Sequence, residues 1–331
     1  MDEKTLRVKE MYSEFPYPYP DQQNGGLDDV AVYMKFFERE NNVSFTNARI
    51  LDAGCGTGHR TVEIAKAYPV ATVVGIDMTT RSLNEARRQA LEMHLSNVEF
   101  LERNLLEPLD FAPFDFIVST GVIHHLGNPA LGLSHLVDIL ADNGFLLLWL
   151  YGAIGEFDRR LNRELVRSFM TSADSFADGI DIIRNLGLGI EYDRYGNSYA
   201  DNEITQKVQN SIDADALLHE IVEFMRIDDI IELFRKAHLN YFTLDGITLS
   251  GEDTLRAVLT DKTYRDNAMK FTDIKKFLSA NLLKKYNSFD KQKRARILEL
   301  LYKPVGYTVL GWKKSPRAGE RITDATILLN G

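Results

Sequence analysis

The residues most suggestive of chemistry are a glycine-rich segment followed by an acid. Gly54, Gly56 and Gly58 come after a short apolar run, and a helical pattern of apolar residues begins directly after them. Glycines at a strand-to-helix turn let the backbone approach a ligand closely, and N–H groups at a helix start favour anionic groups. A second apolar run, 72–76, ends at Asp77, whose carboxylate can accept from both hydroxyls of a ribose. The pattern predicts a nucleotide-like site, although its spacing differs from the Gly-x-Gly-x-x-Gly of dinucleotide enzymes.

The segment 51–58, Leu-Asp-Ala-Gly-Cys-Gly-Thr-Gly, together with Asp77, resembles the nucleotide motif of the class I S-adenosylmethionine (SAM) dependent methyltransferases. The resemblance continues to about Trp149, because three later segments fit the third, fourth and fifth strands of that family. It implies that SAM is the cofactor and S-adenosylhomocysteine the product. The alternative, in which the glycines only form a tight turn, would leave those later segments unexplained.

The resemblance also implies which residues contact the cofactor. Residues 98–106 resemble the third strand, which ends beside adenine in the family. This chain has Asn104 where many relatives have Asp, and an amide can both accept and donate. Residues 114–121 resemble the fourth strand, whose end passes the sulfonium. The predicted cofactor-binding residues are Asp52, Ala53, Gly54, Cys55, Gly56, Gly58, Asp77, Met78, Asn104, Leu105, Thr120 and Gly121.

Two adjacent histidines, His124 and His125, follow the predicted fourth strand. In the family this position lies near the methyl group, and histidine has a pKa that suits a general base near neutral pH. They are the predicted catalytic residues, with His125 preferred. Methyl transfer can also rest on alignment, since its electrophile is already activated, so a pocket-shaping role stays open. His135, on the next predicted helix, is expected to be a surface or packing residue.

The resemblance implies an α/β fold with a doubly wound, Rossmann-like sheet. The sheet is expected to have seven mostly parallel strands, the last one an antiparallel edge. The resemblance implies strands at 98–106, 114–121, 241–244 and 306–312. The sequence pattern itself places strands at 48–51, 72–76 and 145–151. It places helices at 27–39, 128–140 and 227–238, and a turn at 142–144.

The chain is predicted to consist of a core with additions, mostly helical. The predicted parts are an N-terminal cap (1–47), the first part of the SAM-binding core (48–154), a substrate-binding or lid insertion (155–226), the continued core (227–250), a helical insertion (251–301), the last core strand (302–313) and a loose tail (314–331).

The N-terminal segment 11–20 contains prolines at alternate positions 16, 18 and 20. Proline fixes φ and favours an extended chain, so this segment is predicted not to be helical. It forms either a strap packed across the fold or a lid over cofactor and substrate. The predicted substrate or cap residues are Tyr12, Tyr17, Tyr19 and Tyr195. The tyrosines at 17, 19, 192, 195 and 199 favour a partly apolar or aromatic acceptor.

Amino-acid composition and net charge limit the kinds of protein that this chain can be. The 331 residues are 44% hydrophobic and 26% charged, which suits a chain with a substantial core. The net charge of −9 argues against a general nucleic-acid binder. The basic run 284–296 is the best candidate for a local binding patch, and a solvated helix face is the favoured interpretation.

The single cysteine, Cys55, excludes an internal disulfide and a structural zinc cluster. It is expected to be a small residue beside the cofactor rather than a nucleophile. His219 and Glu220 lack a third ligand at helical spacing, so no metal is predicted. With no leader and no apolar run of about 18 residues, a cytoplasmic location without membrane contact is expected.

The leading hypothesis is a SAM-dependent methyltransferase that acts on a small molecule, with O-methylation favoured over N- and C-methylation. A protein or RNA methyltransferase is one alternative, although the acidic charge weakens it for RNA. A non-catalytic SAM-binding interaction protein is another, because a cofactor motif predicts binding alone. The oligomeric state and the acceptor itself cannot be predicted from this sequence.

Overall fold

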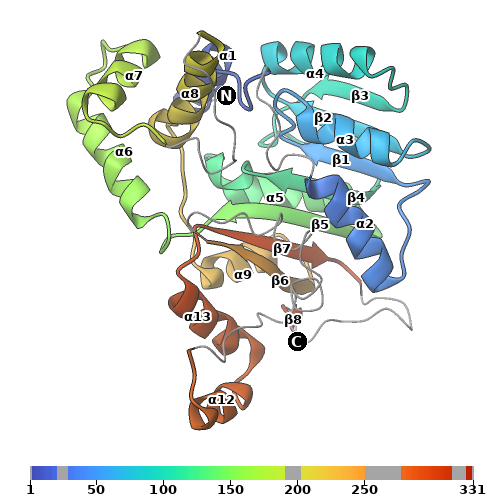
Figure 1. Ribbon diagram of the computed structural model, residues 1–331. Helices are drawn as coiled ribbons and strands as arrows, with labels where there is room; N and C mark the ends of the chain where they lie inside the picture. Colours follow the sequence, from blue (N-terminus) through green and yellow to red (C-terminus); the bar gives the residue numbers. More distant parts are fainter. Residues whose placement is uncertain (1, 21–28, 191–202, 250–276, 315–325, 330–331) are drawn as a thin grey trace.

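The structure is a computed structural model that describes residues 2–20, 29–190, 203–249, 277–314 and 326–329 (Figure 1). At its centre is an eight-stranded sheet in the order β3-β2-β1-β4-β5-β7-β6-β8. The strands from β1 to β5 pair in parallel, whereas β7 runs antiparallel to both β5 and β6. The strands are β1 Arg49–Ala53, β2 Thr72–Asp77, β3 Val98–Glu102, β4 Phe114–Thr120, β5 Leu140–Tyr151, β6 Tyr241–Thr248, β7 Gly306–Trp312 and β8 Thr326–Leu328.

The predicted doubly wound, mostly parallel sheet is confirmed, with three corrections. An eighth strand, β8, pairs with β6 where a loose tail was predicted, because Ile327 lies opposite Phe242 and Leu329 is buried. The antiparallel strand β7 lies between β5 and β6 rather than at the edge. The predicted turn at 142–144 belongs to β5, whose pairing with β4 shifts register between Phe114 and Phe116 and so absorbs these turn-forming residues.

Helices cover both faces of the sheet, and the strand residues alternate between them. Ile50 packs into a cluster with Phe37 and Ile64, on the side of α2 and α3, while Leu51 joins the opposite cluster with Leu136 and Ile230, on the side of α5 and α9. The helices are α1 Glu3–Glu14, α2 Asp29–Asn41, α3 His59–Ala67, α4 Thr80–Glu92, α5 Pro129–Asp138, α6 Phe157–Phe169, α7 Phe176–Asn185, α8 Glu203–Asp213, α9 Ile227–Lys236, α12 Ala280–Asn287 and α13 Lys291–Tyr302; short helical turns are η1 Ile123–His125 and η3 Ala214–Leu218.

A separate helical group, made of α1, α6, α7, α8 and η3, lies beside the carboxyl end of β5 (Figure 1). Its small apolar core joins Met11 of α1 to Val166 of α6, Ile183 of α7 and Leu217 of η3. The N-terminal segment and the insertion after β5 therefore form one unit, because α1 buries its apolar side against the insertion.

The prediction that 11–20 is not helical was wrong for its first four residues. Asp2 caps α1 by accepting hydrogen bonds from the Thr5 backbone N–H (3.0 Å) and the Thr5 hydroxyl (2.6 Å). The helix ends at Glu14, before the first proline at Pro16, so the proline pattern constrains the chain only beyond that point. The division of the chain into seven parts stays a prediction.

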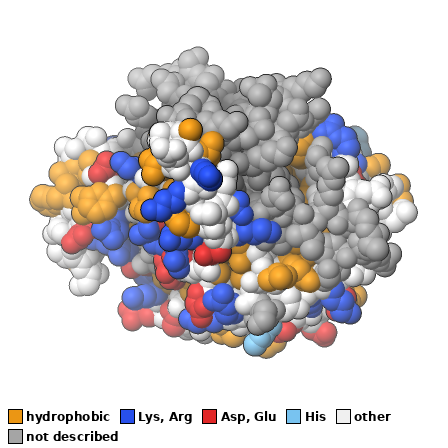
Figure 2. Space-filling view, turned by 90° about the horizontal axis from the view of Figure 1, so that it is seen from below, with side chains coloured by type: hydrophobic (Ala, Val, Ile, Leu, Met, Phe, Trp, Pro, Cys, Tyr) orange, Lys and Arg blue, Asp and Glu red, His pale blue; other side chains and the backbone are white. Residues whose placement is uncertain are grey.

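A buried carboxylate connects α13 to the sheet and to α9. Glu299 is 2% exposed and accepts hydrogen bonds from the Arg226 guanidinium, the Ile227 backbone N–H and the Tyr307 hydroxyl. The predicted basic run 284–296 is partly used in this region, since Arg296 pairs with Asp228 of α9. Seen from below, basic side chains on this face are interspersed with hydrophobic and acidic ones (Figure 2).

Candidate functional site

The glycine turn between β1 and α3 has the backbone that its sequence predicts. Gly54, Gly56 and Gly58 all have positive φ, a region that side-chain-bearing residues rarely adopt. The Gly54 and Cys55 N–H groups both donate to the Ile76 carbonyl (2.8 and 2.9 Å), which ties the turn to β2. These contacts bring the turn beside Asp77, at the carboxyl ends of the parallel strands.

The Asp77 carboxylate lies at the end of β2 and orders the loop around it. One oxygen accepts from the Gly56 N–H (3.0 Å) and the other from the Thr79 N–H (2.8 Å). Burial raises the pKa of this carboxyl group, and the two backbone donors oppose that effect. Each oxygen retains further acceptor capacity, which suits hydroxyl donors of a ligand.

Several predicted cofactor residues make hydrogen bonds or packing contacts within the protein. The buried Asp52 carboxylate accepts from the Thr61 hydroxyl (2.7 Å) and from Arg60 (3.3 Å). Asn104 accepts from the Leu106 N–H (3.0 Å) and donates to Glu107 (3.2 Å), so its amide stabilises the local turn. Leu105 is buried in the main core.

The remaining predicted cofactor residues lie around the turn. Ala53 and Cys55 are buried, Met78 is half-buried, and burial raises the pKa of the Cys55 thiol well above its usual value. A thiol held protonated is a poor nucleophile, in agreement with the packing role expected from the sequence.

At the end of β4, an unpaired hydroxyl group lies next to open space. The Thr120 hydroxyl is buried and has no hydrogen-bond partner among the described residues. Beside it, Gly121 has positive φ, and a Cβ placed there would meet no atom within 4 Å. An unpaired hydroxyl next to open space, across from a glycine turn and a carboxylate, fits a ligand that carries both polar and anionic groups.

The N-terminal strap, residues 15–20, crosses the glycine turn. The Thr57 hydroxyl donates to the Pro18 carbonyl (2.8 Å), and a Cβ at Gly56 would overlap the Tyr17 carbonyl oxygen. The Arg81 guanidinium donates to the Ser13 carbonyl (2.5 Å) at the end of α1. Tyr17 and Tyr19 therefore belong to a segment that contacts the predicted cofactor loop, whereas Tyr195, with Tyr192 and Tyr199, lies outside the described residues.

Next to the glycine turn, η1 places the two predicted catalytic histidines, His124 and His125, in an aromatic cluster. The His124 ring lies 4.2 Å from the rings of both His125 and Tyr151, measured between centroids. The His125 ring lies 4.0 Å from that of His219, a residue of the insertion. Trp149 and Phe224 add further walls, at 5.2 and 6.0 Å from Tyr151.

One residue of the insertion fixes the tautomers of two histidines in opposite senses. The Ile221 carbonyl lies 2.9 Å from His125 Nδ1, so Nδ1 carries the proton and donates. The Ile221 N–H donates to His219 Nδ1 (3.1 Å), so that nitrogen is the acceptor. His125 Nε2 is therefore a lone-pair acceptor and His219 Nε2 is an N–H donor.

The cluster is buried, which keeps its histidines neutral. Desolvation lowers the pKa of His124 and His219 well below the usual value and that of His125 to a smaller extent. Both ring nitrogens of His124, and Nε2 of His219, have no hydrogen-bond partner among the described residues. Such unpaired buried polar atoms point to a site that contacts a ligand or water.

Charged groups of the helical group surround these rings. The Tyr12 hydroxyl donates to the Asp215 carboxylate (2.6 Å), and the Tyr12 ring contacts His219 edge-on at 5.5 Å. The Arg163 guanidinium, 5% exposed, donates to the Ala216 carbonyl (2.8 Å) and the His219 carbonyl. Burial lowers the pKa of Arg163 to about 10.

Sequence reasoning placed Tyr12, His124 and His125 at the site but missed most of their neighbours. Tyr151, Asp215 and Arg163 carry no motif, and the structure brings them in from β5, η3 and α6. In the sequence, His219 stands out only as one ligand of an incomplete metal site. Its proximity to His125 depends on how the insertion folds. His135 packs locally, with Nδ1 2.9 Å from the Leu105 carbonyl.

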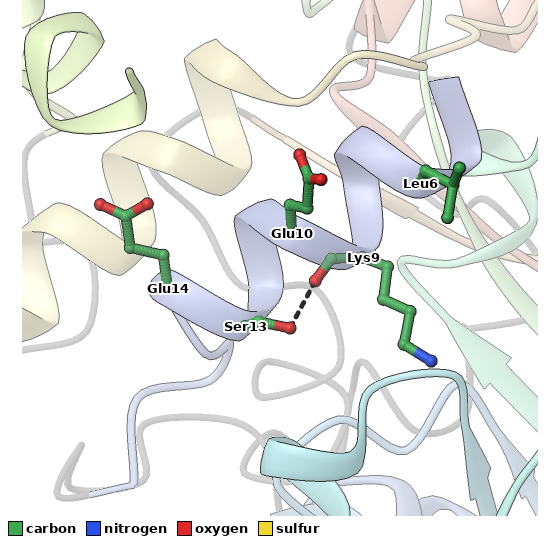
Figure 3. A pocket seen from close by; sticks show the side chains of 5 residues that line it. All are labelled: Leu6, Lys9, Glu10, Ser13 and Glu14. Atoms are coloured by element: carbon green, nitrogen blue, oxygen red, sulfur yellow. Dashed lines mark hydrogen bonds between the residues drawn. The ribbon is translucent and has the colours of Figure 1, made fainter. Parts of the chain in front are cut away.

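A pocket of about 480 Å³ lies along α1. It is lined by Leu6, Lys9, Glu10, Ser13 and Glu14 (Figure 3). Lys9 pairs with Glu102 (2.8 Å), and the Ser13 hydroxyl donates to the Lys9 carbonyl. Glu10 and Glu14 of this pocket are exposed and Lys9 is paired, so the buried histidine cluster is the better candidate site.

Comparison with known proteins shows which proteins the chain resembles. Residues 44–177 match the family described as "Methyltransferase domain". The chain therefore contains a methyltransferase domain of the class I SAM-dependent type. It is 26% identical to a malonyl-[acyl-carrier protein] O-methyltransferase of Halalkalibacterium halodurans, over 58% of this chain and 66% of that protein. It is 32% identical to a trans-aconitate 2-methyltransferase of Azoarcus, over 35% of this chain and 44% of that protein.

Among solved structures, PKMT2 from Rickettsia typhi, in complex with AdoHcy, shares this methyltransferase's fold. The TM-score is 0.61 at 19% identity, and the match covers 90% of this chain and 55% of that one. The chain spans about half the length of most of the curated relatives that it matches.

The described residues also bear on metal binding and on membrane insertion. Within those ranges, no group of three His, Cys, Asp or Glu side chains is arranged to hold a metal ion. In the same part of the chain, no helix has both the length and the apolar character to cross a bilayer.

Proposed function

We propose that this methyltransferase transfers the methyl group of SAM to a hydroxyl oxygen of a small, partly aromatic molecule. The observation that carries the proposal is the fixed tautomer of His125, whose Nδ1 donates to the Ile221 carbonyl and whose Nε2 therefore presents a lone pair. A base in that state accepts the proton of a hydroxyl group without first losing one of its own.

The glycine turn, Asp77 and the Thr120 hydroxyl would hold the cofactor. The glycine turn lets the backbone approach a ligand closely, Asp77 offers acceptor oxygens for ribose hydroxyls, and Thr120 offers an unpaired hydroxyl. When bound, SAM supplies an electrophilic methyl group. Family membership supports this cofactor, and the S-adenosylhomocysteine product would occupy the same residues.

The two fixed tautomers support a hydroxyl acceptor over a carboxylate or an ammonium group. A hydroxyl can donate to His125 Nε2 and accept from His219 Nε2–H. A carboxylate has no proton for the first contact, and an ammonium group has no lone pair for the second. The Tyr151 ring, 5.5 Å from that of His125, and the rings of Trp149 and Phe224 next to Tyr151 favour an aromatic or otherwise flat acceptor.

The first test is cofactor binding, measured by calorimetry with SAM and S-adenosylhomocysteine. Replacing Asp77 with Ala should weaken binding at least about tenfold, since charge-assisted hydrogen bonds contribute about 1.5–3 kcal/mol each. Asp77→Asn, which keeps one acceptor oxygen and the side-chain size, should lose less. Glu99→Ala, an exposed change on β3, is the control. Unchanged affinity in a folded Asp77→Ala protein, or preference for NADH, would contradict the assignment.

The second test identifies the acceptor class. Purified protein is incubated with isotopically labelled SAM and a panel of phenols, aliphatic alcohols, carboxylic acids and amines, and labelled products are analysed by mass spectrometry. Methyl ethers of phenols or enols are expected. Methyl esters or N-methyl products would contradict the hydroxyl proposal, and labelled peptides from a lysate would favour a protein acceptor instead.

A further inference from the structure

Helix α6 has its apolar side facing away from the protein. Its inner side buries Arg163 (5% exposed) and Val166, and Arg159 is nearly buried beside Glu156. Large apolar residues occur every four positions on its outer side, with exposures of 43–59%. These residues, here called the α6 stripe, are Phe157, Leu161, Leu165 and Phe169.

Exposed apolar residues are common singly, but a continuous stripe along a helix marks an interaction surface. In Figure 1, α6 lies at the outer margin of the molecule, and hydrophobic side chains gather on the same side in the view from below (Figure 2). Because α6 contacts α7 and η3 through Val166 and the buried Arg163, most of its large apolar side chains lie outside that contact, unlike those of an ordinary surface helix.

We propose that the α6 stripe is the contact between two copies of this chain, related by a two-fold axis near Arg163. The stripe is palindromic about that position. When two α6 helices run antiparallel, Phe157 meets Phe169 of the second copy and Leu161 meets Leu165. Rows of side chains four residues apart pack between one another when two helices cross at about −50°. The whole α6 stripe can therefore remain in contact with the stripe of the second copy.

The charges beside the stripe fit the same arrangement. Arg160 and Glu164 are exposed and lie on one flank of the stripe, and no ion pair joins either of them to another of the described residues. The Arg160 guanidinium lies over the Phe157 ring, 5.1 Å from its centroid, so it is held beside the stripe. A two-fold axis between antiparallel helices brings equal flanks together, so Arg160 faces Glu164 of the second copy and the reverse pair forms as well.

The size of the stripe sets the expected strength of the dimer. Four half-exposed Leu and Phe side chains offer roughly 400 Å² per copy. A standard interface buries about 800 Å² per partner, so the stripe supplies about half of it and flanking residues the rest. We therefore expect a reversible dimer with a dissociation constant of about 1–100 µM rather than an obligate one.

Sedimentation equilibrium of the full chain across this concentration range tests the proposal. The double change Leu161→Glu with Leu165→Glu should make the protein monomeric while its thermal unfolding is unchanged, because both side chains are exposed in the monomer. Leu91→Glu, a 74% exposed change on α4, is the matched control and should leave the dimer intact.

A charge exchange tests the palindromic geometry itself. Arg160→Glu alone and Glu164→Arg alone should each weaken the dimer, and the protein with both changes should regain it. Wild-type protein that stays monomeric to 200 µM, roughly the upper limit of the expected range, would overturn the proposal. A dimer that survives the Leu161→Glu, Leu165→Glu change would also overturn it, as would binding of a monomer to lipid vesicles through the stripe.

Discussion

Gly56 and Gly121 share a left-handed backbone but face different surroundings. A Cβ at Gly56 would overlap the Tyr17 carbonyl of the strap, whereas a Cβ at Gly121 would meet open space. Replacing either with Ala should cost about 1–2 kcal/mol in backbone strain. Gly56→Ala should in addition displace the strap, so proteolysis within 15–20 should accelerate in that variant alone. Equal proteolysis of the two variants would mean that the strap does not rest on Gly56.

His125 is the residue whose ionisation should control the reaction. Burial lowers the pKa of His125. The Asp215 carboxylate of η3 raises this pKa, whereas the Arg159 and Arg163 guanidinium groups of α6 lower it further. The other rings packed against His125 are neutral, and they belong to His124, His219 and Tyr151. The base must be neutral, so the rate should be constant above about pH 6.5 and fall as pH drops through the lowered pKa.

Single-turnover rates of His125→Gln should be about 10²–10⁴-fold lower than wild type, with cofactor affinity retained. His219→Gln should lower the rate less and should raise the KM for the acceptor, since it removes one donor. His135→Gln is the control, because that ring contacts the Leu105 carbonyl outside the cluster. Rates within a few-fold of wild type in His125→Gln would leave a pocket-shaping role.

Which residues could be predicted depended on whether their neighbours lay close in sequence. Gly54, Gly56, Gly58 and Asp77 belong to one strand–turn–helix–strand unit, where the turn itself sets their geometry. His219 reaches His125 across 94 positions, through a helical insertion whose packing has no local pattern. Its role follows from Ile221, an apolar residue that acts through its backbone and so leaves no signature in the sequence.

Helix α1 links the core to the insertion, and a few polar contacts hold it on the core side. Arg81 donates to the Ser13 carbonyl, and Lys9 pairs with Glu102 of β3. These groups are largely exposed, so Arg81→Ala should change overall stability by no more than about 1 kcal/mol. It should nevertheless loosen the strap, which limited proteolysis can follow.

Arg88→Ala is the control for that change, since its ion pairs with Glu85 and Glu92 lie within α4. S-adenosylhomocysteine should slow cleavage of the strap in wild type and to a smaller extent in Arg81→Ala. If ligand has no effect on cleavage in either protein, the strap is a packed structural segment and not a lid.

At the scale of elements, apolar periodicity located the core strands and several helices, and the errors have identifiable causes. Residues 306–312 coincide with β7, because that strand is buried on both faces and reads as an apolar run. Residues 142–144 read as a turn, yet a register shift accommodates them within β5. The eighth strand escaped detection because three residues carry too little pattern, and their pairing with β6 depends on the finished sheet.

Strand β8 should matter for the whole molecule more than its length indicates. It covers β6, Leu329 is 5% exposed, and the Leu329 carbonyl accepts from Arg235 of α9 (3.1 Å). A protein that ends at Lys314 should unfold at a lower temperature and aggregate, since the backbone groups of β6 become an open sheet edge. Light scattering during a thermal ramp would measure both effects. Leu328→Ser, at a 62% exposed position of β8, should behave as wild type.

The position of β7 has a consequence for how the protein is made. On a ribosome, β1 to β5 emerge early and can assemble a parallel half-sheet, but the outer edge of β5 waits for a partner that begins 155 residues after Tyr151, at Gly306. At about 5–20 residues per second, that delay lasts roughly 8–30 s. During this time an apolar strand edge is exposed to other nascent chains. Synthesis should therefore be the stage at which this protein depends most on chaperones, and slower translation should lower its yield.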